Sequence, residues 1–154
     1  MIYILIVLMI AIGDYLIKDY IEKHKELGGR QEILGGRVIL RRHHNEGAFL
    51  NFMNENKEIL KIISGTLLTL FSLIFLLLLP RKGKKMLKLG LALALGGSIS
   101  NVTDRMKRGY VVDYFSFNCK KLKNIIFNLS DMAIFLGSAL TLLSTLFSSE
   151  SDAD

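Results

Sequence analysis

The chain has very little of what stabilises small secreted or metal-bound proteins. Its 154 residues include one cysteine, one proline and no tryptophan. A single cysteine excludes an internal disulfide framework and any cysteine-based zinc cluster. The composition, with 51% hydrophobic residues, also excludes a disordered or collagen-like chain. No internal repeat or low-complexity segment is visible, and the length fits a single domain over residues 1–154.

The chain is basic, with a net charge of +6. A basic chain often binds nucleic acid, but here the basic residues flank long apolar runs. The sequence therefore favours a membrane as the partner and argues against nucleic acid.

Four apolar segments organise the chain, and a spanning helix needs about 20 such residues. They predict transmembrane helices at about 2–17, 59–79, 86–102 and 129–147. No Lys or Arg precedes the first run, so we interpret it as a retained helix rather than a signal peptide. The third run is rich in Gly and Ala, which allow close helix packing in lipid, and it is expected to be central.

The segments between the helices contain short β-branched runs. Residues 33–40 carry such runs around Gly35-Gly36 and predict a hairpin, and residues 110–115 and 125–127 predict further strands. Residues 19–23 predict a short surface helix. Because an open sheet edge cannot lie in hydrocarbon, the sheet is expected at the membrane surface. The expected fold is a mainly α membrane protein: a four-helix transmembrane bundle with a small β-sheet and a short surface helix.

The charge pattern leaves the orientation open. Four spans place both termini on one face of the membrane. The short basic loop Arg81–Lys85 favours the cytoplasm for that face, but the opposite face carries more cations by raw count.

Ionisable groups near the helix ends are costly in a membrane and suggest function. Asp14 and Lys18 are spaced i, i+4 and share a helix face, where they form either part of a site or an ion pair that seals the helix end. Asn101, Asp104 and Arg105 share one face of the third helix, either as site residues or as an ordinary interfacial network.

Two further carboxylates lie near the fourth helix. Asn128 and Asp131 are spaced as a helix N-cap with an acidic first turn, which would explain Asp131 without any chemistry. Asp113 has no such explanation, because it interrupts an apolar strand-like run. Two carboxylates brought close share a proton, so Asp113 and Asp131 could supply a general base and a general acid.

Other catalytic schemes are poorly supported. His24, His43 and His44 have no metal-ligand spacing, and we interpret them as surface or interfacial histidines. Cys119 has no activating partner in the sequence, and no glycine pair is followed by a phosphate-loop pattern. We therefore expect no metal and no cofactor.

Taken together, these motifs resemble signal peptidase II, a family of bacterial inner-membrane aspartyl proteases that process lipoproteins. The resemblance covers nearly the whole chain and follows the family's order. Its four blocks are Asp14-Tyr15-Leu16-Ile17-Lys18, Asn45-Glu46-Gly47-Ala48-Phe49, Gly96 to Arg105 continued by Gly109 to Tyr114, and Phe127-Asn128-Leu129-Ser130-Asp131.

The resemblance implies a role for each matching residue. Asp113 and Asp131 match the family's catalytic dyad. A second group matches polar positions around the substrate or supporting positions: Asn45, Gly47, Asn101, Arg105, Asn128, Asp14, Lys18 and Asp104. The family also implies an extracytoplasmic β-cradle, cytoplasmic termini, a dyad near the outer surface of the inner membrane, and a monomer that acts on a lipidated prolipoprotein among membrane lipids.

The sequence departs from the family pattern at four places. Ile17 replaces a Ser or Thr, Ser100 a Gly and Ser130 an Ala, and Phe49 directly follows Ala48. The added hydroxyls of Ser100 and Ser130 could shift a carboxylate pKa or narrow the substrate groove.

Two alternatives to the peptidase remain at this point. A catalytically silent or substrate-shifted paralogue would act as a membrane binding protein. A small proton-coupled carrier would use Asp14, Asp113 and Asp131 as a path, and it predicts carboxylates spread through the depth of the membrane.

Overall fold

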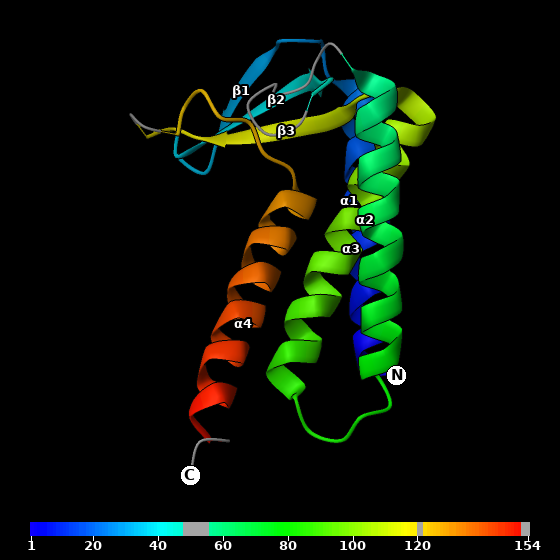
Figure 1. Ribbon diagram of the computed structural model, residues 1–154. Helices are drawn as coiled ribbons and strands as arrows, with labels where there is room; N and C mark the ends of the chain where they lie inside the picture. The colour runs from blue at the N-terminus through cyan, green and yellow to red at the C-terminus, as the bar shows by residue number, and fades with distance from the viewer. Residues whose placement is uncertain (48–55, 120–121, 152–154) are drawn as a thin grey trace.

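The computed structural model describes residues 1–47, 56–119 and 122–151. The described residues form four helices and three strands in the order α1 (Ile2–His24), β1 (Arg30–Ile33), β2 (Val38–Asn45), α2 (Lys57–Leu78), α3 (Lys85–Arg108), β3 (Val111–Phe117) and α4 (Leu129–Ser151). The sheet caps one end of the helices (Figure 1). The start of α1, the end of α4 and the α2–α3 connection lie at the other end.

Three of the described helices are long and apolar enough to cross a membrane: α2, α3 and α4 as far as Phe147. The fold is therefore that of a mainly helical membrane protein with a small sheet. The expected count of four spans is not reached on this measure, because α1 carries Asp14, Lys18 and Asp19 within its 23 residues.

Three helices run several residues beyond the predicted apolar segments, and α4 does so by continuing past 147 to Ser151. Residues 19–24 continue α1, so the predicted separate surface helix at 19–23 is wrong; residues on this turn, such as Ile21, are still buried against the sheet. The third helix extends past 102 to Arg108 because Asp104 stays buried there. It ends at Gly109, whose φ of +80° is the left-handed conformation that favours glycine after a helix.

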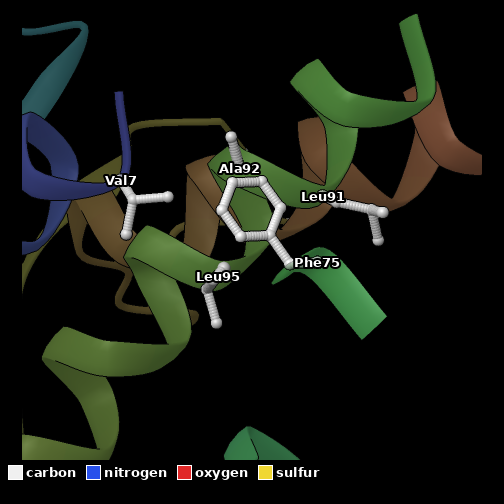
Figure 2. Packing of buried hydrophobic residues seen from close by; sticks show 5 residues of the cluster. All are labelled: Val7, Phe75, Leu91, Ala92 and Leu95. Carbon is white, nitrogen blue, oxygen red and sulfur yellow. The ribbon is translucent and has the colours of Figure 1, made fainter. Parts of the chain in front are cut away.

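The third helix packs against each of the other three, as its small residues predict. An added Cβ on Gly90 would lie 2.6 Å from the Thr141 hydroxyl and 2.7 Å from the Gly137 carbonyl oxygen, so α3 and α4 touch through their backbones. On its other side, the ring of Phe75 from α2 packs over Ala92 (Figure 2).

The sheet is antiparallel throughout, in the order β1-β2-β3. The predicted hairpin around Gly35-Gly36 is confirmed as β1 and β2. The predicted strand at 125–127 is wrong, since only Phe127 makes an isolated bridge, to Phe115. A register shift between Leu40 and His43 places His43 directly opposite Asp113.

A fully buried ion pair lies where the helices meet the sheet. The Lys18 ammonium is 2.8 Å from Asp14 and 3.2 Å from Asp104, and all three side chains are excluded from solvent. Asp104 also accepts the backbone N–H of Val112 at 3.1 Å, which joins the end of α3 to β3.

The Asp14 carboxylate accepts hydrogen bonds from three further elements. Ser100 of α3 donates at 2.7 Å and Ser130 of α4 at 2.5 Å. The Tyr114 hydroxyl of β3 donates at 2.9 Å and the backbone N–H of Leu129 at 3.1 Å. Burial and the nearby Asp14 charge raise the pKa of Tyr114, so its hydroxyl remains a donor. We call Asp14, Lys18, Ser100, Asp104, Tyr114 and Ser130 the polar junction.

Replacing Lys18 by Met should leave the buried Asp14 carboxylate without its cation. Breaking a buried pair in this way costs about 3–5 kcal/mol, so the melting temperature in detergent should fall sharply. The matched control is Lys23→Met, which removes an exposed i, i+4 pair with Asp19 on the same helix. Equal melting temperatures for the two variants would contradict a stabilising junction.

Candidate active site

A cavity of about 390 Å³ opens between the sheet and the adjoining ends of α3 and α4. Its polar lining comes from β2, β3, α3 and α4, and its apolar lining from β3, the segment before α4, and α4. The lining residues are His43, Asn45, Asn101, Arg105, Val111, Asp113, Asn124, Ile125, Ile126, Phe127, Asp131, Ile134 and Phe135.

The start of α4 brings two carboxylates to this cavity. Asn128 precedes the helix and accepts the backbone N–H of Asp131 at 2.8 Å, while Asp131 accepts the backbone N–H of Asn128 at 3.1 Å. This reciprocal pair is a capping box, which fixes the first turn of α4. The amide of Asn128 also donates to Asp113 at 2.7 Å. One residue therefore ties the Asp113 carboxylate to the helix turn that carries Asp131.

Asp113 is buried in β3 and accepts a second hydrogen bond, from the Asn45 amide at 3.0 Å. Burial and the nearby Asp131 charge raise the pKa of Asp113 from 3.8 to about 7, against the lowering effect of its two amide donors. Near neutral pH this carboxyl can thus hold a proton.

Asn101 connects the cavity to the polar junction beneath it. Its side-chain oxygen accepts a hydrogen bond from Lys18 at 2.8 Å, and its amide donates to Asp131 at 3.0 Å. Because Lys18 can only donate, the amide group of Asn101 must face Asp131. The buried cation therefore sets the orientation of a residue that holds a cavity carboxylate.

Arg105 supplies a cation to the cavity wall. One of its nitrogens lies 3.4 Å from the carbonyl oxygen of Gly47 and another 3.4 Å from that of Asn101. Its Nε is buried and finds no hydrogen-bond partner among the described residues. The guanidinium charge thus lies on the same cavity as the carboxyl groups of Asp113 and Asp131.

The structure brings most of the predicted site residues together. The cavity is lined by Asp113, Asp131, Asn45, Asn101 and Arg105. Asn128 donates a hydrogen bond to Asp113, and the Gly47 carbonyl oxygen lies near Arg105. Three predicted residues, Asp14, Lys18 and Asp104, lie one layer below in the polar junction and do not line the cavity.

Three of the sequence's departures from the family pattern can be located. The Ser100 and Ser130 hydroxyls both donate to Asp14, so neither narrows the cavity. Ile17 is 39% exposed on the outside of α1. The departure at Ala48 and Phe49 lies outside the described residues.

Sequence analysis missed His43 as a site residue. The interpretation as a surface or interfacial histidine suits the exposed His24, and the half-buried His43 in addition lines the cavity. The signal was present, because residues two apart on a strand share a face and His43 is two residues before Asn45. His44 faces away from the cavity: its ring is hydrogen-bonded to Glu22 at 2.7 Å and stacks on Tyr110.

The arrangement suits acid–base chemistry on a water molecule. Two carboxylates at one cavity, one of them able to hold a proton near neutral pH, can serve as a general acid and a general base of the same residue type. In the part of the chain that the structure describes, no three His, Cys, Asp or Glu side chains gather to hold a metal ion.

Comparisons with known proteins identify one family. The family model described as "Signal peptidase (SPase) II" matches residues 6–147. The lipoprotein signal peptidase of Lactobacillus johnsonii is 31% identical over 97% of this chain and 95% of its own length. That of Bacillus velezensis is 30% identical over 97% of this chain and 96% of its own length.

Solved structures share the fold. Two bacterial membrane enzymes superpose with TM-scores of 0.84 and 0.79, at 22% and 23% identity, covering 99% and 94% of this chain and 91% and 92% of theirs. The family match over most of the chain, together with relatives of about the same length, is decisive: this chain belongs to the signal peptidase II family, the aspartic-type lipoprotein signal peptidases.

Proposed function

We propose that this peptidase removes the signal peptide of a diacylglyceryl-modified prolipoprotein, cutting just before the lipidated cysteine, with Asp113 and Asp131 as its catalytic dyad. The observation that carries the proposal is the Asn128 bridge, which holds a β3 carboxyl and an α4 carboxyl at one cavity. Asn45, Asn101 and Arg105 are the polar residues that surround the cleaved bond.

The reaction uses one proton on the dyad. Asp113 holds that proton, because its pKa is raised to about 7 by burial and by the charge of Asp131. Asp131 takes a proton from water, whose oxygen bonds to the scissile carbonyl carbon, and Asp113 passes its proton to the carbonyl oxygen. When the C–N bond breaks, a proton returns from the dyad to the leaving nitrogen. Hydrogen-bonded amides on both carboxyls hold them in place throughout.

The apolar part of the cavity suits a substrate that arrives through the membrane. Phe135 is 50% exposed and Ile134 lies beside it on α4, so the wall next to the dyad is continuous with a lipid-facing helix surface. A signal helix lies in this groove, while the acyl chains of the modified cysteine remain in the bilayer.

The proposed enzyme has four spans, with α1 as the additional one. The exposed face of α1 is apolar, with Leu5, Leu8, Met9 and Ile12, while Asp14 and Lys18 point into the buried polar junction. Both termini are then on the side of the basic loop Arg81–Lys85, which favours the cytoplasm. The dyad lies near the outer surface of the bacterial inner membrane, and the enzyme works as a monomer among membrane lipids.

The alternatives gain no support from the arrangement. A proton-coupled carrier needs carboxylates spread through membrane depth, yet Asp14 is hydrogen-bonded to the same α4 turn that carries Asp131. A silent paralogue would have no need for two carboxylates held by four side-chain and backbone donors at one cavity.

Replacing either Asp113 or Asp131 by Asn should lower cleavage of a diacylated precursor by about 100- to 10,000-fold, because an amide neither takes nor gives the required proton. The measurement is cleavage by purified, folded protein, with unmodified precursor compared in parallel. Asp19→Asn, an exposed position on α1, is the matched control. Cleavage at the wild-type rate by either dyad variant would refute the assignment, and equal cleavage of both precursors would refute the lipid requirement.

The cleavage rate should also fall as pH rises through about 7. The pKa of Asp113 is raised to about 7, so its proton is present below that pH and is lost above it. A profile of kcat/KM from about pH 5 to about pH 9 should therefore show a descending alkaline limb with a midpoint near neutrality. A rate that stays constant to the alkaline end of this range would show that the reaction does not need the Asp113 proton.

A further inference from the structure

His43 stands directly opposite Asp113 in the β2–β3 ladder. Side chains opposite one another on an antiparallel pair share a face, with their Cβ atoms about 4.5–5.5 Å apart. His43 and Asp113 both line the cavity, together with Asn45, which is on the same face of β2. The imidazole is thus part of the cavity wall nearest the proposed dyad.

Two other polar side chains of the wall already hold the carboxyls, and Asn124, in the segment before α4, also lines the cavity. The amides of Asn45 and Asn101 donate to the two carboxyls, and Arg105 can only donate. A neutral imidazole has one donor and one acceptor. An extended peptide presents both a carbonyl oxygen and an N–H, so it can use both imidazole nitrogens.

The surroundings of His43 keep the ring neutral. Burial lowers its pKa, and the charges of His44 and Arg41 on the same strand lower it further. Asp113 from β3, Arg105 from α3 and Asp131 from α4 line the same cavity. Near neutral pH, where Asp113 holds the dyad's proton, no full charge on β3 opposes this effect.

We propose that His43 is a substrate-contacting residue, whose neutral imidazole hydrogen-bonds the peptide backbone beside the bond to be cut. The inference rests on the proposed function. Protonation of His43 removes the acceptor nitrogen and places a cation opposite Asp113. Acidic pH should therefore weaken substrate binding through His43, separately from any change in the dyad.

Two variants of His43 distinguish the loss of its hydrogen bonds to the substrate from the loss of its titration. His43→Gln keeps a donor and an acceptor but does not titrate, whereas His43→Val keeps a strand-favouring shape and removes both. His44→Gln is the matched control, since the neighbouring ring faces Glu22 and Tyr110 on the opposite side of the strand. The assay is cleavage of a diacylated precursor, with kcat and KM measured across pH and folding checked by thermal melting.

For His43→Val we expect KM to rise about tenfold at neutral pH with a smaller change in kcat, the effect of losing a buried hydrogen bond to substrate. For His43→Gln we expect a KM near that of wild type at neutral pH. Its KM should then stay nearly constant as pH falls, where the wild-type KM rises. His44→Gln should behave as wild type at every pH.

A wild-type KM in His43→Val would overturn the proposed hydrogen bond to the substrate. A raised KM in both His43→Val and His43→Gln would overturn it as well, because binding would then depend on the shape of the side chain and not on its hydrogen bonds. A wild-type acid response in His43→Gln would overturn the titration of this ring. If His43→Val does not fold, the Gln variant alone decides. Asp113→Asn is run beside them: an inactive Asn variant with unaffected His43 variants rejects this inference alone, whereas an active one rejects the proposed dyad.

Discussion

The buried ion pair between Asp14 and Lys18 is the interaction on which the rest of the structure depends. A charge pair in a membrane protein's interior is tolerated only when its remaining hydrogen-bonding capacity is satisfied. Three elements contribute to this: α3 with the Ser100 hydroxyl and the Asp104 carboxylate, α4 with the Ser130 hydroxyl, and β3 with the Tyr114 hydroxyl. Moving any of these elements would leave part of the pair without a partner. The helices and the sheet are therefore fixed relative to one another at the level of the cavity.

The same network reaches the cavity directly. Lys18 orients Asn101, and Asn101 holds Asp131. On the other side, the Asn128 cap holds Asp131 through the backbone and Asp113 through its amide. The two interpretations of Asp131 in the sequence, as a helix-capping residue and as a site carboxylate, are therefore compatible. The cap is the means by which the carboxylate is positioned.

Much of this could be predicted from sequence because it depends on local patterns. Apolar length predicts the helices, the i, i+4 spacing predicts that Asp14 and Lys18 pair, and Gly35-Gly36 predicts the hairpin. The end of α1 could not be predicted from hydropathy, since residues 19–24 are polar and stay helical through contacts with the sheet. The segment 125–127 has strand-like residues, but its backbone meets β3 only at Phe127. The pairing of β2 with β3 includes a register shift, so the position of His43 opposite Asp113 could not be predicted from the local sequence.

The departures from the family pattern show where this sequence has changed and where it has not. Ser100 and Ser130 add hydroxyls at positions facing Asp14, and with the Tyr114 hydroxyl from β3 they meet on one carboxylate. Each hydroxyl would be an unsatisfied buried group without that acceptor, and Asp14 would lack donors without them. Ile17, where the pattern has a hydroxyl, faces outward and takes no part. The departures that lie in the described residues are thus Ser100 and Ser130, in the polar junction beneath the cavity, and Ile17, on the outer face of α1. The sequence motifs that resemble the family's include the cavity residues Asp113, Asp131, Asn45 and Asn101, so the chemistry proposed for these side chains does not depend on the changes at Ser100 and Ser130.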